Sequence, residues 1–231
     1  MRLEKTDADG NLDAISEGYD RFWEHLLTQE DYWAHRPRTL RRRALEFIPK
    51  DARTILDLGC GNGEAMKALS NRGILLCGID ISSKALEKAR GSGEVLKGDV
   101  TRIPIRDGAF DCVLVLDVFE HVIDKRDLMK EIHRILNDSG TAIMTIPLPQ
   151  ATDGQGDSRQ PYDKPIRYSE MIEMSANLFK VERSVGSSWM PLLPRRLEPL
   201  IPISIGFALF KSFPGLIERS ETVLLILRKL V

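Results

Sequence analysis

The chain has few cysteines, few aromatic residues and no excess of charge of either sign. Its 231 residues include three cysteines, and Phe, Trp and Tyr together make up 6% of the sequence. Three scattered cysteines cannot build a disulfide framework or a zinc knuckle, so buried reduced thiols are expected. The 33 Lys and Arg residues and the 34 Asp and Glu residues leave a formal net charge of −1. The protein therefore has no overall positive field that would attract nucleic acid.

The amino-terminal residues lack the apolar core of a secretory signal, because residues 1–15 read MRLEKTDADGNLDAI. A reducing, cytoplasmic setting is therefore expected. Hydrophobic residues make up 42% of the chain and charged residues 29%, as in ordinary soluble globular proteins. These values exclude a wholly disordered chain, a collagen-like chain and an integral membrane bundle. The length suits one domain, alone or with an added segment.

Strand and helix patterns alternate regularly through most of the chain. Residues 1–18 are polar and predict a mobile arm, and residues 19–47 are amphipathic and aromatic, with a helix expected from Pro37 to about Phe47. Strands are expected at 54–58, 75–80, 94–99, 111–116, 141–146, 179–185 and 222–229, and helices at 64–70, 83–90, 127–136 and 169–177. This alternation predicts right-handed crossovers and a doubly wound α/β fold, with a parallel sheet covered on both faces.

A glycine-rich loop follows the first expected strand and leads directly into a helix. It reads Asp57-Leu58-Gly59-Cys60-Gly61-Asn62-Gly63. Glycines let the backbone approach a ligand closely, although a purely structural turn is the alternative. The spacing G-x-G-x-G differs from the dinucleotide fingerprint G-x-G-x-x-G. An acid at position 57 suits an ammonium group and would repel a pyrophosphate, which favours S-adenosylmethionine over NAD.

Two further carboxylates end the next two expected strands. Asp80 lies about as far beyond the glycines as a ribose-binding acid does, and its two oxygens can accept both ribose hydroxyls. Asp99 can accept a hydrogen bond from an adenine amino group. Each acid alone could equally be a solvated strand end. Ligands of such sheets bind at the carboxyl ends of the strands, so three features at successive strand ends favour a nucleotide site.

Four segments resemble the successive motifs of class I S-adenosylmethionine-dependent methyltransferases. They are ILDLGCGNGEAMKAL, GIDIS, GDVTRIPIRDGAFDCVLVLDVFEHV and LNDSGTAIMTIP, which together span about residues 54–146. The resemblance implies a seven-stranded sheet whose last strand, 222–229, is antiparallel. It also implies two parts of the chain: amino-terminal arm and helices at 1–47, and a cofactor-binding methyltransferase domain at 48–231.

The resemblance further implies which residues bind the cofactor. The implied ligands of the methionine part are Asp57, Gly59, Cys60, Gly61 and Gly63; those of the ribose and adenine are Asp80, Ile81, Asp99 and Val100; and Asp117 lies at the methyl-donor end.

The segment after the fourth strand contains the candidate catalytic residues. His121 could act as a general base whose proton affinity is set by Glu120 or Asp117. A packing or helix-start role is the alternative. Asp117-x-x-Glu120-His121 also resembles the E-x-x-E-H metal site of ubiquinone-pathway and small-RNA O-methyltransferases. Because Asp replaces the first Glu and no later His follows, we assign no metal. A divalent cation bound by Asp117, Glu120 and His121 stays an alternative.

Nucleic acid is not the expected acceptor. The Asn/Asp-Pro-Pro-aromatic loop of the amino-directed nucleic-acid enzymes is absent at 117–120, which argues against DNA N-methylation. One feature favours RNA or a phosphate, namely the run of arginines at Arg36, Arg38, Arg41, Arg42 and Arg43. At helical spacing, however, such a run is more typical of a solvated helix face.

An apolar insert at 187–220 and a loop at 147–167 flank the expected acceptor site. Residues 199–210 contain no charge, and Trp189, Arg195, Arg196 and Lys211 flank them like headgroup anchors. The insert could be a lid over a hydrophobic acceptor, a membrane-contacting element, a dimer face or a core extension. We expect a cap over a lipid-like acceptor, with peripheral contact to a membrane.

The sequence therefore predicts a methyltransferase that uses S-adenosylmethionine to methylate an oxygen or carbon of a small, hydrophobic or lipid-like acceptor. An RNA or protein methyltransferase is the alternative within enzymes. A regulatory protein that binds the cofactor without turnover is the alternative from another class.

Overall fold

The structure is a computed structural model that describes residues 12–28, 38–149, 160–186, 205 and 214–231. Seven strands form one sheet in the order β3-β2-β1-β4-β5-β7-β6. The strands are β1 Thr54–Leu58, β2 Leu75–Asp80, β3 Glu94–Lys97, β4 Phe110–Leu116, β5 Leu136–Pro147, β6 Phe179–Gly186 and β7 Thr222–Lys229. Strand β7 runs antiparallel to β5 and β6, whereas the other neighbouring pairs are parallel. The predicted mostly parallel sheet with an antiparallel last strand is confirmed.

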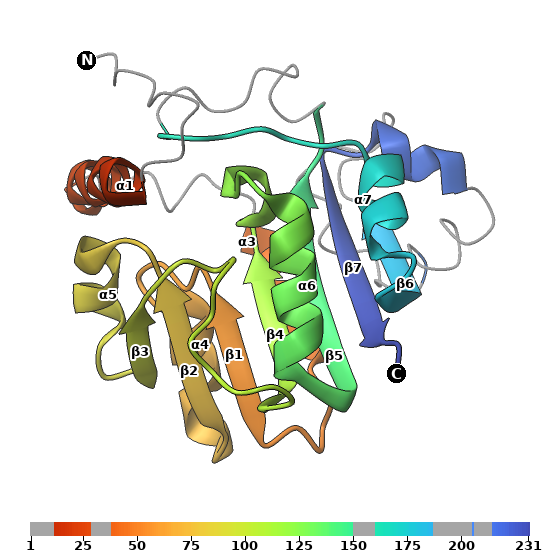
Figure 1. Cartoon of the computed structure of the whole chain (residues 1–231), viewed down its shortest axis with the longest axis horizontal. Coiled ribbons are helices and arrows are strands. Elements are labelled where there is room, and N and C mark those ends of the chain that lie inside the picture. Colours follow the sequence, from red (N-terminus) through yellow and green to blue (C-terminus); the bar gives the residue numbers. More distant parts are fainter. Residues whose placement is uncertain (1–11, 29–37, 150–159, 187–204, 206–213) are drawn as a thin grey trace.

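Helices cover both faces of this sheet. They are α1 Leu12–Leu27, α3 Arg38–Ala44, α4 Glu64–Leu69, α5 Ser83–Ala89, α6 Lys125–Ile135 and α7 Tyr168–Ser175. Helix α6 lies in front of β4 and β5 in the view of Figure 1, while α3 and α4 lie behind the sheet. The residues of β4 from Cys112 to Leu116 are at most 2% exposed, as expected for a central strand with both faces covered.

Most predicted elements agree with the structure to within a few residues, but the amino-terminal arm does not. The prediction of a polar arm through residue 18 is wrong for residues 12–18, because α1 begins at Leu12. Ile15 and Tyr19 are buried on the same face of this helix, four residues apart. Of the residues between them, Glu17 is exposed, whereas the small residues Ser16 and Gly18 are buried, so the buried face is not marked by large apolar side chains alone.

Two strand boundaries differ from the prediction, and one open choice of helix cap is decided. Strand β5 begins at Leu136, five residues before its predicted start, and its pairing with β4 has a register irregularity between Leu136 and Thr141. Strand β3 ends at Lys97, so Asp99 lies in the turn that follows it. Of the two serines considered as the cap of α5, Ser82 is the one whose hydroxyl accepts the Ala85 N–H, at 3.1 Å.

The apolar insert predicted at 187–220 lies outside the described residues except for Ile205 and 214–220. Residues 150–159 of the predicted loop 147–167 also lie outside them. The predictions of a cap and of a membrane contact by the insert therefore stay predictions. Within the described part of the chain, no helix combines the length and the apolar character that crossing a bilayer requires.

Two glycines allow a test of how tightly α4 and α5 pack. Gly63 and Gly73 both have left-handed backbone conformations, with φ of 75° and 67°. A Cβ on Gly63 would lie 3.0 Å from Cα of Ala89 in α5, whereas a Cβ on Gly73 would meet nothing within 4 Å. We expect Gly73→Ala to lower the free energy of unfolding by about 1–2 kcal/mol through backbone strain alone. Gly63→Ala should cost about 1–3 kcal/mol more, because it also overpacks the helix contact.

Chemical denaturation of the two variants beside the unsubstituted protein measures both costs. Equal losses of stability would show that the contact between α4 and α5 relaxes without cost.

Candidate functional site

A pocket of about 480 Å³ lies at the carboxyl ends of the central strands. This volume is within the range of small-molecule and cofactor sites, about 300–1,000 Å³. Its walls are the glycine loop at 59–62, the strand ends and turns at 80–81, 98–102 and 116–118, the segment 121–124 with Asp127, part of α1, Arg41 and Gln160. One cavity thus joins the expected nucleotide-binding turns to the expected acceptor side.

Most of the residues predicted from the sequence line this pocket. The structure places nine of them in its wall: Gly59, Cys60, Gly61, Asp80, Ile81, Asp99, Val100, Asp117 and His121. Asp57, Gly63 and Glu120 are not among the lining residues. Asp57 and Glu120 are buried, and Gly63 begins α4 against α5.

Asp80 joins the glycine loop to the turn after β2. One of its carboxylate oxygens accepts the Gly61 N–H and the other accepts the Ser82 N–H, each at 2.8 Å. Burial raises the pKa of Asp80 to about 6, although these hydrogen bonds oppose the shift. Each carboxylate oxygen has two lone-pair positions, so the same group can still accept ribose hydroxyls.

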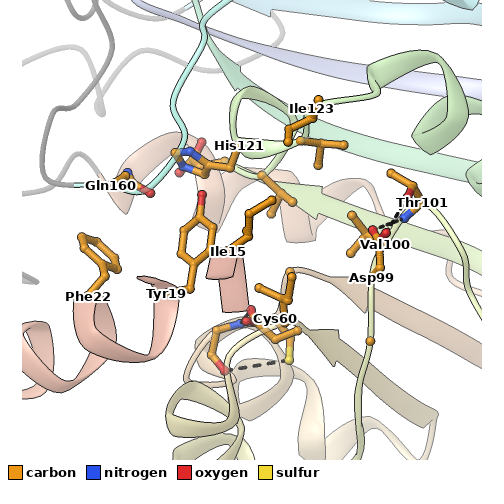
Figure 2. A pocket seen from close by; sticks show the side chains of 18 of the residues that line it. Ile15, Tyr19, Phe22, Cys60, Asp99, Val100, Thr101, His121, Ile123 and Gln160 are labelled. Atoms are coloured by element: carbon orange, nitrogen blue, oxygen red, sulfur yellow. Dashed lines mark hydrogen bonds between the residues drawn. The ribbon is translucent and has the colours of Figure 1, made fainter. Parts of the chain in front are cut away.

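Asp99 is fixed by its own turn. Its Oδ1 accepts the Thr101 N–H at 2.9 Å, and its Oδ2 accepts the Thr101 hydroxyl at 2.8 Å (Figure 2). Val100 lies between them in the chain and also lines the pocket. These two hydrogen bonds within the turn hold the Asp99 carboxylate in place beside the pocket, as a ligand for an adenine edge requires.

The backbone of Asp117 is strained. Its φ of 56° makes it the one non-glycine residue with a positive φ in the described part of the chain. Such conformations cost about 1–3 kcal/mol and persist where neighbouring contacts hold them. The Asp117 N–H donates to the Thr145 carbonyl at 3.0 Å, and the Thr145 hydroxyl donates to Asp117 Oδ1 at 2.8 Å.

Asp117 also faces a residue that the sequence analysis did not place in the site. The Nε atom of Arg41 lies 3.6 Å from Asp117 Oδ2, and Arg41 lines the pocket. In the sequence, Arg41 belongs to a run of arginines whose members cannot be told apart. Its neighbour Leu40 and Ala44, one turn further along α3, are buried, while Arg42 is exposed. The helix phase set by Leu40 and Ala44 is the signal that could have singled out Arg41.

His121 lies in the wall of the pocket, and its ring contacts one carbonyl oxygen and two carboxylates, one of them Asp163, whose Oδ1 lies 3.9 Å from Nδ1. Its Nδ1 lies 2.9 Å from the Tyr162 carbonyl oxygen, and its Nε2 lies 3.4 Å from Glu120 Oε1. Because a carbonyl oxygen only accepts, Nδ1 carries a proton in this arrangement. Nε2 lies beside the buried Glu120 carboxylate.

Comparison with known proteins decides the family. A family model described as "Methyltransferase domain" matches residues 56–144, which hold the glycine loop, Asp80, Asp99, Asp117 and His121. A methyltransferase chain from a Haloferax volcanii complex with the Trm112 methyltransferase activator superposes with a TM-score of 0.69 and 21% identity, over 93% of this chain and 96% of that one. Residues 56–144 belong to this methyltransferase-domain family, and the superposition shows the same fold. The family resemblance and its cofactor, S-adenosylmethionine, are confirmed.

Curated relatives match only part of this chain. Demethylmenaquinone methyltransferase of Thermotoga maritima is 31% identical over 118 residues, which is 48% of this chain and 52% of that protein. The 27-O-demethylrifamycin SV methyltransferase of Amycolatopsis mediterranei is 28% identical over 148 residues, or 55% of this chain and 53% of that protein. The chain thus spans about half the length of these two relatives.

The fold also occurs outside this reaction class. The structure of SpnF, described as a cyclase, superposes with a TM-score of 0.63 and 18% identity, over 84% of this chain and 80% of that one. The shared fold alone therefore does not fix the reaction, and the residues of the site must carry that argument.

Helix α1 forms a wall of the pocket that the sequence analysis missed. In Figure 1 the helix lies above α5 and the upper ends of β2 and β3. The Ser16 hydroxyl donates to the Ile81 carbonyl at 2.9 Å, and Asp20 Oδ1 accepts the Ser82 hydroxyl at 2.6 Å. At the other side of the pocket, the Tyr19 hydroxyl points toward His121 and donates to the Tyr162 carbonyl at 3.0 Å (Figure 2).

The side chains of α1 approach the glycine loop closely. A Cβ on Gly61 would lie 2.6 Å from Cζ2 of Trp23, so only glycine fits at this position beneath the helix. Ile15, Tyr19 and Phe22 line the pocket with Trp23. The signal in the sequence is their recurrence at helical spacing across residue 18, where the predicted arm ends.

The geometry does not support the alternative of a metal site. The Asp117 carboxylate faces Arg41 and Thr145, whereas Glu120 is buried beside His121 and outside the pocket wall. Across the described ranges, no three His, Cys, Asp or Glu side chains come together in a group that could hold a metal ion.

The pKa of Asp57 is raised in the folded protein, and the effect of this shift on stability can be tested without any ligand. Burial raises its pKa to about 7, the Asp80 carboxylate adds to this shift, and the Arg41 cation opposes it. Because the folded protein holds this proton more tightly than the unfolded chain, Asp57 makes stability fall as the pH rises from about 4 to 7.

We expect Asp57→Asn to remove this penalty. At pH 8 the variant should exceed the unsubstituted protein in free energy of unfolding by up to about 4 kcal/mol, from 1.36 kcal/mol per pKa unit. The difference should shrink as the pH falls toward 5. Urea unfolding at several pH values measures it, with the exposed Asp51→Asn as control. A variant that is less stable at pH 8 would show that the Asp57 charge is well compensated.

Proposed function

We propose that this methyltransferase transfers the methyl group of S-adenosylmethionine to an oxygen or carbon of a small, apolar acceptor. The observation that carries the proposal is that Asp80, Asp99, Asp117 and His121 all line one continuous pocket. In-line displacement at a methyl group depends mainly on holding two reactants in one geometry. A continuous cavity lined by nucleotide-binding turns at one side and apolar side chains at the other suits that task.

The residues present fit the cofactor. Asp80 and Asp99, fixed by backbone N–H groups, would hold the ribose hydroxyls and the adenine edge, with Ile81 and Val100 as apolar neighbours. Asp117 would face the cationic methyl-donor end. The cofactor supplies a sulfonium methyl group, which is electrophilic without further activation. The chain therefore has to orient the acceptor, exclude water and receive a proton.

The acceptor side of the pocket supports an apolar substrate. Ile15, Tyr19 and Phe22 of α1 line the pocket together with Val122 and Ile123. Ile123 is 50% exposed and Leu12 is 44% exposed, although both line the pocket. Exposed apolar side chains at a cavity favour a ligand that covers them. The two curated relatives described above, named for demethylmenaquinone and 27-O-demethylrifamycin SV, support a small-molecule acceptor.

We propose His121 as the general base and Glu120 as the group that stabilises its charged form. The support is that Nδ1 is oriented by the Tyr162 carbonyl while Nε2 lies beside the Glu120 carboxylate. An acceptor hydroxyl or acidic C–H placed at Nε2 would lose its proton as the methyl group transfers. The imidazolium would then share its charge with Glu120.

Binding of the cofactor has a specific test at Asp80. We expect Asp80→Ala to weaken the binding of S-adenosylhomocysteine by about 100-fold or more, because two hydrogen bonds to a charged group are lost. The matched control is Asp111→Ala. Asp111 also accepts backbone N–H groups, from Arg53 and Thr54, but at the opposite end of β1. Calorimetric titration should show lost affinity in the first variant and unchanged affinity in the second. Equal losses would mean that general destabilisation causes them.

Transfer itself is tested with radiolabelled S-adenosylmethionine and a panel of acceptors. Phenols, quinols and fatty-acyl lipids are offered beside total RNA and a mixture of proteins. We expect the radiolabelled methyl group to be transferred to the apolar small molecules. His121→Ala should lower kcat by about 10²–10⁴-fold while its affinity for S-adenosylhomocysteine stays unchanged. Label only in RNA or protein would favour the macromolecular alternative. Cofactor binding without transfer to any acceptor would favour the regulatory alternative.

A further inference from the structure

Arg41 places a positive charge inside the pocket, beside Asp117. We propose that Arg41 is the residue that binds a carboxylate in this pocket. The inference rests on the proposed function, because it concerns a ligand of the same site. The inference assigns a role to Arg41 alone among the arginines of the run at 36–43, and the proposed reaction uses none of the others.

The position of Arg41 suits this role. Its side chain is 26% exposed, which places it between a core position and a solvated surface position. The guanidinium reaches the pocket from α3, a helix whose Leu40 and Ala44 are buried in the core. Burying part of a guanidinium is costly unless its charge is used. A ligand carboxylate is the group that arginine holds best, through two parallel hydrogen bonds.

The contact with Asp117 is compatible with a second anion. The atom of Arg41 nearest to Asp117 is Nε, and the distance of 3.6 Å is that of an ion pair rather than a hydrogen bond. Asp117 Oδ1 accepts the Thr145 hydroxyl instead. The two terminal nitrogens of the guanidinium carry four further N–H donors. Arg41 can therefore keep its ion pair while it donates to a carboxylate in the pocket.

The charges around Arg41 complement a zwitterion. Arg41 lowers the pKa of the buried Asp57, so its charge also acts on the acid that precedes the glycine loop. When Asp57 and Asp117 are both ionised, these two acids and Arg41 together carry a net charge of −1. The methionine part of S-adenosylmethionine carries an ammonium, a carboxylate and a sulfonium, and so one excess positive charge. Without Arg41, the carboxylate of the ligand would face the two acids Asp57 and Asp117 with no cation beside it.

The carboxylate could come from either of two ligands. One source is the methionine part of the cofactor, and the other is an acidic group on the acceptor. Two thioether probes separate these sources. S-adenosylhomocysteine carries the amino acid carboxylate, whereas 5′-deoxy-5′-methylthioadenosine keeps the adenosine and the thioether but lacks that carboxylate.

The experiment compares Arg41→Gln with the unsubstituted protein by calorimetric titration of both probes. If Arg41 binds the cofactor carboxylate, Arg41→Gln weakens S-adenosylhomocysteine by about 10- to 150-fold, the effect of one hydrogen bond to a charged group. The affinity for methylthioadenosine stays unchanged. Arg41→Lys, which keeps the charge, should recover part of the loss. The matched control is Arg42→Gln, because Arg42 is the next residue of α3 and is exposed.

A further titration with benzoate tests the acceptor as the source. Benzoate, an apolar carboxylate, is added to protein saturated with S-adenosylhomocysteine. If Arg41→Gln binds S-adenosylhomocysteine normally but loses benzoate, the carboxylate belongs to the acceptor and the proposal holds.

Three outcomes would overturn the proposal. Unchanged affinity for both carboxylates would show that Arg41 binds neither. Parallel loss of S-adenosylhomocysteine and methylthioadenosine would show that Arg41 only supports the shape of the pocket. Failure of the unsubstituted protein to bind either thioether would overturn the proposed function as well, and this separates the two failures.

Discussion

The Asp80 carboxylate is the contact on which the rest of the site depends. It accepts one backbone N–H from the glycine loop after β1 and another from the turn after β2. These two hydrogen bonds fix the distance between the loops that follow the neighbouring strands β1 and β2. The Ser82 hydroxyl, at the same turn, caps α5 and donates to Asp20 of α1. A single buried acid thus connects the sheet, the glycine loop and the helix that covers the pocket.

Helix α1 covers part of the carboxyl end of the sheet and forms one wall of the pocket. At one side it is tied to the turn after β2 through Ser16 and Asp20, and at the other it meets the Tyr162 carbonyl through Tyr19. His121 uses the same carbonyl. The carbonyl of Tyr162 therefore couples the position of the proposed base to the position of α1. A ligand that displaces one of the two donors would change the surroundings of the other.

Charge is concentrated where methyl transfer would occur. Asp57 and Asp80 have pKa values raised by burial to about 7 and 6, and the strained Asp117 lies beside Arg41. Burial also lowers the pKa of Lys125 to about 8, close to Glu120 and Asp163. Carboxylates held at such a cost are characteristic of binding sites, because a cationic ligand offsets the penalty of burying them. The arrangement agrees with a cofactor whose reacting end is positively charged.

The amino-acid sequence by itself determined the strand and helix alternation, the glycine loop and the strand-end acids, because each depends on residues close together in the chain. Periodicity and loop chemistry are local, so Asp80 and Asp99 could be selected from the order of residues, and the family resemblance added Asp117. Only the tertiary structure decided that α1 walls the pocket, that Arg41 faces Asp117, and that Asp57, Gly63 and Glu120 lie outside the pocket wall. Those facts depend on contacts between residues far apart in the chain, such as Ser16 with Ile81 and Tyr19 with Tyr162, which no local pattern records.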